Sequence, residues 1–448
     1  MNPHIKEARL TLALAFPIII GQVSQMLMGV TDTVMIGRLG TVPLAASAFA
    51  GGVFSVFFVI GIGLLLPVAV FASREHGAGD DAAGGVWLKH GVMLSVLASV
   101  AGIALMLGLS AGFDRMGQPP EVVAAVEPYY TLIVVSLLPA LVFQVFRQFA
   151  EALGRPWVPM LIMLGGVALN VVLNWILIYG NLGAPALGLA GAGWATLVSR
   201  IAPLVAVVVW VRRDAMFKKA WPLEWLSGFA AARFREMLRV GVPAAVMLMF
   251  EVGAFMTAAL MMGWLGAVEL AAHQIALSCA AFMFMFPLGL SMAVGMRVGK
   301  AVGEGRTEAL RSIAFGALVM SCAIMSVSAA GFAAGGTLLA RGFVSDPATV
   351  ELAARLLVVA AIFQLFDGAQ VIGSGALRGL TDVRVPAGIT FIAYWVLAIP
   401  GGYALGLHTS LGAVGIWAGL ATGLAIAAVL LALRFLFLTK EKTKFVTY

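Results

Sequence analysis

The fold of this chain is decided by apolar stretches such as LTLALAFPIIIGQVSQMLMGVTDTVMI at residues 10–36. This stretch carries a single charged side chain, Asp32, and exceeds the ~20 residues that a helix needs to cross hydrocarbon. Similar stretches recur along the whole chain, which is 62% hydrophobic and 11% charged. Soluble chains are about 45–50% apolar and about 25% charged. The sequence therefore predicts an all-α membrane protein.

The spacing of the apolar stretches predicts about twelve transmembrane helices. The segments that connect successive helices must alternate between the two sides of the membrane. With that alternation, almost all Lys and Arg residues fall on the same side. This bias places both termini and the polar stretch at 212–235 in the cytoplasm and predicts a multi-pass protein of the cell inner membrane. The expected helices cover about residues 10–36, 46–72, 90–112, 128–150, 159–179, 187–211, 237–263, 271–296, 312–337, 353–374, 386–407 and 412–437.

An internal repeat divides the chain into two halves. At an offset of 226 residues, Pro17 aligns with Pro243, and Gly63 with Gly289 in one of two possible registers. We expect an N-terminal six-helix bundle at 1–211, a cytoplasmic linker at 212–235 and a C-terminal six-helix bundle at 236–448. Six helices is an even number, so the two bundles share one orientation and are expected to be pseudo-symmetric around a central cavity.

Three carboxylates lie inside expected membrane helices. Asp32 is late in the first helix, Glu251 is in the middle of the seventh and Asp367 is in the middle of the tenth. A charge in hydrocarbon costs ~2.5–3.5 kcal/mol on insertion scales, so such residues face a cavity or a partner. We interpret all three as candidate coupling-cation sites.

Glu251 and Asp367 both belong to the second half, and Gln25 aligns with Glu251 in the first half. Two carboxylates that face each other either bind a cation or share a proton. Sodium prefers hard oxygen ligands, whereas a proton needs only one carboxylate that titrates near working pH. The residue pattern is compatible with coupling to either Na⁺ or H⁺. If the ion is Na⁺, Glu251 and Asp367 are its expected ligands.

Two pairs at i, i+4 spacing each share one helix face. Arg147 and Glu151 are expected to pair with each other, which is a structural role. Asn170 and Asn174 could face Asp32 across the first bundle or form bonds between helices.

Two further polar residues have structural interpretations. His273 is expected to make a satisfied polar contact near the outer interface. Asp346 is expected to be an N-cap, since Pro347 follows it at the first helical position.

Several classes of function are disfavoured. The sequence contains no GxxxxGK[ST] loop for ATP and no HExxH or GxSxG run, so we expect neither an enzyme nor a cofactor. The net charge of +7 follows from cytoplasmic Lys and Arg, so no nucleic-acid partner is expected. An ion gradient is then the expected source of energy.

The chain resembles the multidrug and toxic compound extrusion (MATE) family, in its NorM-like branch. The resemblance covers nearly the whole chain and rests on several motifs together. These are Pro17 with Gln22 and Gln25, MGVTDTVMIG, NVVLNWILIYG followed by GAPALGLAGAGWAT, MFEVGAF, AAHQIAL and FQLFDGAQVIGSGALRG. It implies two six-helix bundles and the export of cationic, amphipathic compounds in exchange for Na⁺ or H⁺.

The resemblance also implies roles for particular residues. Glu251 and Asp367 match the cation-site acids of the second bundle, and Asp32, with Asn174 nearby, matches a first-bundle acid used for coupling. Asp346 matches an outer-side acid that contacts substrate in some members. Phe363 stands one turn before Asp367, where relatives can carry tyrosine, and the missing hydroxyl weakens the case for sodium.

The favoured hypothesis is a monomeric antiporter in the lipid bilayer that exchanges small organic cations for a monovalent cation. A flippase for lipid-linked oligosaccharides is an alternative, but its cavity should be strongly basic, and only Arg147 and Arg200 lie within the expected spans. An intramembrane enzyme would need a nucleophile with a base or a metal site, and neither is evident.

Overall fold

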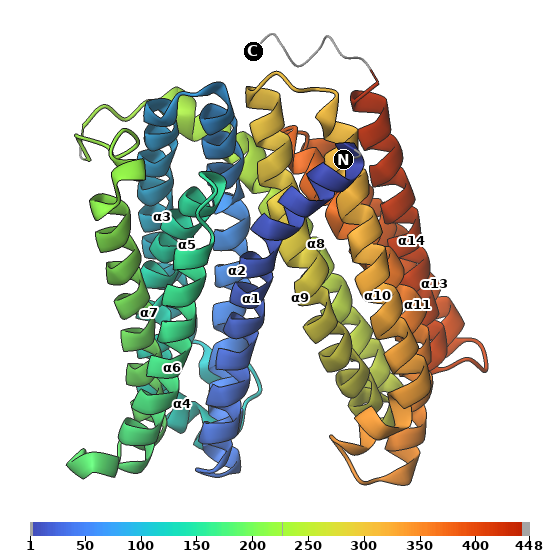
Figure 1. Ribbon diagram of the computed structural model, residues 1–448. Coiled ribbons are helices and arrows are strands. Elements are labelled where there is room, and N and C mark those ends of the chain that lie inside the picture. The colour runs from blue at the N-terminus through green and yellow to red at the C-terminus, as the bar shows by residue number, and fades with distance from the viewer. Residues whose placement is uncertain (1–2, 226, 441–448) are drawn as a thin grey trace. The chain divides into compact units, whose positions relative to one another are not determined.

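The computed structural model describes residues 3–225 and 227–440, and every regular element within these ranges is a helix (Figure 1). In this part of the chain, twelve helical segments are long and apolar enough to cross a membrane. The predicted all-α membrane fold is thereby confirmed. The helices extend beyond the apolar stretches, because a helix keeps its backbone groups bonded both in lipid and at the interface.

The chain forms two compact units, which are described separately. The N-terminal unit comprises Ile20–Ala245, and the C-terminal unit comprises the chain up to Ile19 together with the chain from Val246 onward. Two helices, α1 (Pro3–Gly37) and α8 (Ala231–Leu265), contribute to both units. The start of α8 at Ala231 lies inside the stretch expected as a linker.

The remaining elements belong to one unit each. The N-terminal unit contains α2 (Thr41–Ala78), α3 (Asp81–Ser110), η1 (Phe113–Arg115), α4 (Pro120–Val135), α5 (Leu137–Ala152), α6 (Trp157–Tyr179), η2 (Asn181–Gly183), α7 (Gly188–Arg213) and η3 (Ala215–Phe217). The C-terminal unit contains α9 (Ala267–Gly303), α10 (Ala309–Arg341), α11 (Pro347–Gly379), α12 (Arg384–Phe391), η4 (Ile392–Ala398), α13 (Ile399–Leu407) and α14 (Ala413–Leu438).

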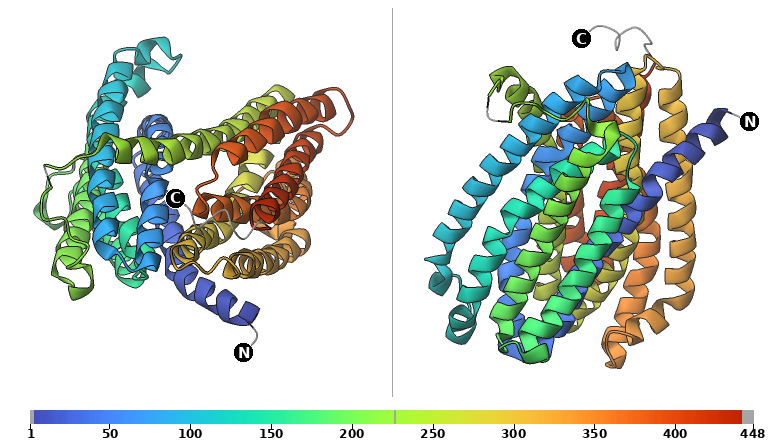
Figure 2. Two further views of the ribbon diagram at one scale, coloured as in Figure 1. Left: turned by 90° about the horizontal axis from the view of Figure 1, so that it is seen from above. Right: turned by 60° about the vertical axis from the view of Figure 1, so that its left-hand side comes forward.

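Helix α11 is central to the C-terminal unit. It packs against α9, α10 and α14, as the views of Figure 2 also indicate. In the N-terminal unit, α7 packs against α4, α5 and α6, and α2 packs against α3, α4 and α5. The residues on the inner faces of α11 and α7 are therefore surrounded by protein rather than by lipid.

Two expected helices are interrupted, and in both cases a proline explains the position. The span expected at 128–150 consists of α4 and α5, which meet at Ser136. Pro139 has no backbone N–H, so it cannot donate the helical hydrogen bond to the carbonyl of Val135, the last residue of α4. The span expected at 386–407 contains the π-helical turn η4, and Pro400 follows it near the start of α13. π-Helical turns are rare in proteins overall, and those that occur often lie at functional sites.

Close contacts at two glycines repeat at equivalent positions of the two halves. A Cβ on Gly63 would lie 2.3 Å from the Cα of Ala245, and a Cβ on Gly289 would lie 2.5 Å from Cγ1 of Ile19. Gly63 and Gly289 are 226 residues apart, and so are their partners Ile19 and Ala245, which is the offset predicted from the repeat. Small residues allow helix backbones to approach in this way. The contacts therefore select the register in which Gly63 aligns with Gly289.

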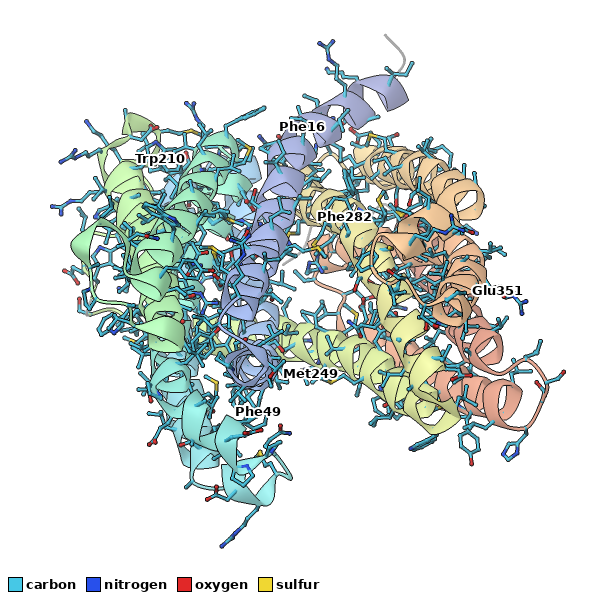
Figure 3. All side chains as sticks on the ribbon, turned by 90° about the horizontal axis from the view of Figure 1, so that it is seen from below. Phe16, Phe49, Trp210, Met249, Phe282 and Glu351 are labelled. Atoms are coloured by element: carbon cyan, nitrogen blue, oxygen red, sulfur yellow. The ribbon has the colours of Figure 1, made fainter. Side chains whose placement is uncertain are left out.

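The outer surfaces of the helices are apolar. Large side chains such as Leu260, Trp264 and Val327 are exposed on the protein, and Figure 3 shows side chains projecting from the helices of each unit. Continuous exposed apolar surface on this scale is unfavourable in water and suits a lipid solvent. Exposed charged side chains occur near helix ends, as at the labelled Glu351, which pairs with Arg355.

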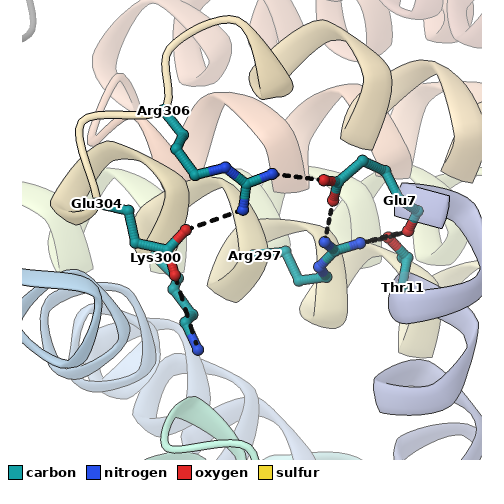
Figure 4. A network of polar contacts seen from close by, with 6 residues as sticks. All are labelled: Glu7, Thr11, Arg297, Lys300, Glu304 and Arg306. Carbon is teal, nitrogen blue, oxygen red and sulfur yellow. Dashed lines mark hydrogen bonds and ion pairs between the residues drawn. The ribbon is translucent and has the colours of Figure 1, made fainter. Parts of the chain in front are cut away.

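A polar cluster attaches the start of α1 to the rest of the C-terminal unit (Figure 4). The buried carboxylate of Glu7 pairs with Arg297 at the end of α9 and, at 2.6 Å, with Arg306 in the following loop. Arg297 also donates a hydrogen bond to Thr11 at 2.6 Å, and Glu304 pairs with Arg306 at 3.0 Å. Glu7 thus contacts both guanidinium groups, of which that of Arg297 is largely buried, and Glu304 supplies a second carboxylate to Arg306.

Replacing Glu7 by Ala should destabilise the protein by about 2–3 kcal/mol, because it leaves the buried Arg297 without its counter-charge. The midpoint of thermal unfolding in detergent measures the effect. Glu351→Ala, which removes one partner of an exposed pair, serves as the control and should change stability by about 0.5 kcal/mol or less. Equal midpoints for the two variants would show that the cluster does not anchor α1.

Candidate functional site

The two acids of the C-terminal unit lie close enough to interact. Glu251 is in the middle of α8 and Asp367 is in the middle of α11, and the two carboxylates repel each other electrostatically. Asp367 is buried, and its Oδ1 atom has no hydrogen-bond partner. Within the described ranges, neither acid belongs to an ion pair, so the negative charge of this region is not balanced by Lys or Arg.

Aromatic rings pack together beside Asp367. Phe363 is buried one turn before Asp367, and its ring contacts those of Phe255 at 5.9 Å and Trp417 at 5.3 Å between centroids. Gln364, the next residue, accepts a hydrogen bond from Ser328 at 3.0 Å. Phe363 therefore contributes packing but no oxygen atom to the region of the acids.

The turn η4 lies beside the part of α8 that carries Glu251. The indole N–H of Trp395 donates to the carbonyl of Phe250 at 3.2 Å, and a Cβ on Gly253 would lie 2.9 Å from the same indole ring. The rings of Phe250 and Phe391 are 5.1 Å apart. These contacts involve Phe250 and Gly253, which precede and follow Glu251 in the sequence.

The N-terminal unit holds the third acid in a hydrogen-bonded setting. Asn174 donates to Asp32 at 2.6 Å, and Thr196 of α7 lies 3.5 Å from its other oxygen. Asn174 also donates to the side-chain oxygen of Asn170 at 3.2 Å, whereas the amide nitrogen of Asn170 has no hydrogen-bond partner. Of the two amides, Asn174 is therefore the one that bonds to the acid. Helices α1, α6 and α7 together position this group.

Asp32 lines a cavity of about 260 Å³ inside the N-terminal unit. The side chains around it are mainly apolar or aromatic, and the polar ones include Gln25, Gln144 and Ser199. Arg200 also lines the cavity, donates to Ser136 at 2.5 Å, lies over the ring of Phe54 at 4.3 Å and attracts Asp32 electrostatically. The cavity therefore carries charges of both signs.

The sequence interpretation gave no role to Arg200, Thr196 or Tyr394. Arg200 was noted as one of two arginines within the expected spans, which are unusual places for an Arg, but it was not connected with Asp32. Thr196 and Tyr394 are unremarkable in an apolar stretch, and only the packing of helices places them near Asp32 and Glu251.

Arg147 and Glu151 pair with each other as expected. The Nε atom of Arg147 lies 2.8 Å from Glu151, and the same guanidinium donates to Gln22 at 2.7 Å. Both charged side chains are buried. Arg147 stands where the other half has Asp367, but its charge is neutralised within its own helix.

The remaining candidates make local contacts. Asp346 is exposed and caps α11, with hydrogen bonds from the backbone N–H of Thr349 at 2.9 Å and its hydroxyl at 2.7 Å, which lower the pKa of the Asp346 carboxyl. His273 is buried, and its Nδ1 atom accepts from Trp417 at 3.1 Å. The N-cap is present as predicted. His273 makes its polar contact through Nδ1 only and is not fully satisfied, because its Nε2 atom has no hydrogen-bond partner.

The oxygen atoms near the acids are suited to a hard monovalent cation rather than to a transition metal. The described residues include no group of three or more His, Cys, Asp or Glu side chains that could hold a metal ion.

The profile of the MatE family matches residues 17–176 and 243–404, one segment in each half. The chain belongs to the MatE family. MatE proteins are transporters, and this chain is accordingly a membrane transporter and not an enzyme.

Curated relatives cover almost the whole chain. A probable multidrug resistance protein NorM of Mesorhizobium japonicum is 37% identical over 444 residues, which cover 96% of this chain and 94% of that protein. The multidrug resistance protein MdtK of Yersinia pestis is 36% identical over 454 residues, 100% of this chain and 99% of that protein. The NorM-like branch predicted from the sequence is confirmed.

Solved MatE structures share the fold. The eukaryotic MATE transporter AtDTX14 superimposes with a TM-score of 0.88 at 21% identity, over 99% of both chains. A MATE transporter in a straight conformation gives 0.90 at 23% identity, over 98% of this chain and 97% of that one. At these identities the likeness concerns the fold alone.

The Arg147–Glu151 pair generates a stability prediction. Glu151→Ala should destabilise the protein by about 3 kcal/mol, since it leaves a buried guanidinium unpaired, whereas the double variant Arg147→Met, Glu151→Met should be much closer to wild type. Thermal unfolding in detergent measures both. Glu236→Ala, in an exposed pair with Arg233, is the control. A double variant as unstable as Glu151→Ala would contradict a structural role for this pair.

Proposed function

We propose that this chain is a secondary active antiporter that exports cationic, amphipathic organic compounds in exchange for Na⁺ or H⁺. The observation that carries the proposal is the unbalanced pair of acids, Glu251 and Asp367, between membrane helices of the C-terminal unit. The names of the curated relatives, which are multidrug resistance proteins, support the same class of cargo.

The pair supplies the coupling. Two carboxylates in a region of low dielectric repel each other, so binding of one Na⁺ or one H⁺ stabilises the pair. Once that charge is neutralised, attraction for an organic cation falls and release of the cargo is favoured. The coupling is reciprocal, so binding of the organic cation lowers the affinity for the ion by the same factor.

A concentration gradient of the ion can drive this exchange. One monovalent cation exchanged for one organic cation moves no net charge, so the driving force is the concentration ratio of the ion, worth ~1.4 kcal/mol for each factor of ten. The sequence has no P-loop for ATP, which is consistent with a transporter powered by the gradient. A sodium ion would use several oxygen ligands, whereas a proton would use one carboxylate of the pair.

The cavity of the N-terminal unit is the second part of the proposal. Its largely apolar lining, with Phe58 and Phe143, suits the hydrophobic body of a drug, and Asp32 attracts its positive group. We assign Asn170, Asn174 and Gln25 as supporting contacts there. Asp32 is also a candidate for a second ion site, because Asn174 and Thr196 supply further polar atoms. Asp346, on the exposed N-cap of α11, is a candidate contact for substrate outside the membrane.

The cellular location and the topology are proposed from the sequence and from the bacterial relatives. We propose a monomer in the cell inner membrane with both termini in the cytoplasm, because Lys and Arg gather on that side. The functional bundles correspond to residues 1–211 and 236–448, joined by a linker at 212–235.

The acid pair is tested by Asp367→Asn in proteoliposomes loaded with a fluorescent organic cation. The variant should reduce gradient-driven efflux about tenfold or more, because the amide cannot exchange a charge with the ion. Na⁺ and H⁺ gradients are imposed separately to identify the coupling ion. Glu351→Gln, which removes an exposed charge, should transport as wild type does. Undiminished efflux by Asp367→Asn would refute the proposed mechanism.

A further inference from the structure

A row of buried polar side chains follows one face of α11 from Asp367 toward the end of the helix. Gln370, Ser374 and Arg378 follow Asp367 at steps of three or four residues, the spacing that keeps side chains on one helix face. Arg378 is the most exposed of the four at 8%, so protein covers the whole row. At ~1.5 Å per residue the row is ~16 Å long, about half of the ~30 Å thickness of hydrocarbon.

Three members of the row have an oxygen atom that no other protein group bonds. These atoms are Oδ1 of Asp367, Oε1 of Gln370 and Oγ of Ser374. Buried polar groups in folded proteins are nearly always hydrogen-bonded, because an unpaired group loses its bonds to water without replacement. Three such atoms in succession on one face indicate that the row does more than pack α11 against its neighbours.

Polar side chains of the same types are satisfied elsewhere in the membrane helices. Ser95 and Ser99 of α3 are also 0% exposed, and their hydroxyls donate to carbonyls of their own helix at 2.7 and 2.6 Å. Gln364 of α11 accepts a hydrogen bond from α10 at 3.0 Å. The oxygen atoms of Gln370 and Ser374 lack the bonds that these residues make, although the same backbone is available to them.

Arg378 closes the row at the end of α11. Its guanidinium lies 3.5 Å from the hydroxyl of Ser291 in α9 and belongs to no ion pair among the residues that the structure describes. Ser291 donates to the carbonyl of Val371 at 2.7 Å, and a Cβ on Gly375 would lie 2.4 Å from the carbonyl oxygen of Ser291. The row therefore runs beside a tight contact between α9 and α11, away from lipid.

We propose that this row is the path by which the coupling ion passes from Asp367 to the cytoplasm. The bias of Lys and Arg assigns the Arg378 end of α11 to that side. Oxygen atoms without protein partners can bind water or the ion itself, and they replace part of its hydration at the depth of the hydrocarbon. The positive charge of Arg378 lowers the concentration of cations at this end and so opposes their return. The inference rests on the proposed function, since the path serves the acid of that mechanism.

The path is tested with Ser374→Cys in a background that carries Cys279→Ala and Cys322→Ala. Ag⁺, a monovalent cation that reacts with thiols, is added to inside-out membrane vesicles, which present the cytoplasmic side. The thiol that remains free is then counted with a fluorescent maleimide after denaturation. The thiol should be lost about tenfold faster, or more, than in right-side-out vesicles, because the path admits a cation from the cytoplasm.

Ala376→Cys in the same background is the matched control. Ala376 is two residues away on α11, is only 1% exposed and lines an apolar cavity of about 310 Å³ with Phe315, Ile372 and Phe435. Burial alone predicts that neither variant reacts, whereas the path predicts that Ser374→Cys reacts and Ala376→Cys does not. Equal rates for the two variants would overturn the inference, and so would faster reaction of Ser374→Cys from the outer side.

Gln370→Leu provides a second measurement, because it removes an oxygen from the path and leaves the acids in place. At a saturating ion gradient, efflux should be about tenfold slower than in wild type. The ion concentration that gives half-maximal efflux should stay within about twofold of wild type, since the path carries the ion but does not hold it. A wild-type rate, or a change confined to the half-maximal concentration, would contradict a role in ion passage.

These outcomes are separable from failure of the proposed function. If Ser374→Cys does not react and wild type still exports the organic cation down an ion gradient, the path fails and the antiporter stands. If Asp367→Asn exports normally, the antiporter mechanism itself fails, and the path loses the site that it serves.

Discussion

Hydrocarbon does not tolerate charge without a partner, and this constraint organises the polar residues of the chain. Glu7 is balanced by Arg297 and Arg306 at the start of α1, and Arg147 is balanced by Glu151 inside α5. Asp32 is bonded to Asn174 and lies near Arg200. Glu251 and Asp367 depart from this pattern, because the described part of the chain offers them no counter-charge. A transporter that must take up and release a cation requires such an exception, since a carboxylate with a permanent partner has nothing to exchange.

The two units meet this constraint differently, although they descend from one repeat. The N-terminal cavity combines a carboxylate with a guanidinium group, so neutralising Asp32 takes its net charge from zero to +1. The C-terminal region has two carboxylates and no guanidinium partner, so an added cation reduces its charge without reversing it. This difference suits the N-terminal cavity for discrimination of cargo and the C-terminal acids for coupling to an ion. The asymmetry arises at aligned positions, where Gln25 corresponds to Glu251.

Backbone geometry supports the same division. Gly63 and Gly289 allow α2 and α9 to approach the crossing parts of α8 and α1, so the repeat has kept a contact that any larger side chain would prevent. Pro139 and Pro400 interrupt two spans, and both interruptions lie next to functional candidates. Ser136, at the first break, binds Arg200, and Trp395, in the π-helical turn before Pro400, bonds to the carbonyl of Phe250, the residue before Glu251. Local departures from the α-helix therefore occur where a polar group bonds to another helix.

The membrane fold, the count of spans, the repeat and the presence of acids at Asp32, Glu251 and Asp367 could be predicted from the sequence. They follow from properties that are local or periodic, namely the length of apolar stretches, the placement of Lys and Arg and the cost of charge in lipid. Which groups meet depends on how the helices pack. Asn174 bonds to Asp32 across 142 residues of chain, and Trp395 bonds to the carbonyl of Phe250 across 145. Helix packing sets such distances, and an apolar stretch gives no sign of which of its tyrosines or threonines will face an acid rather than lipid.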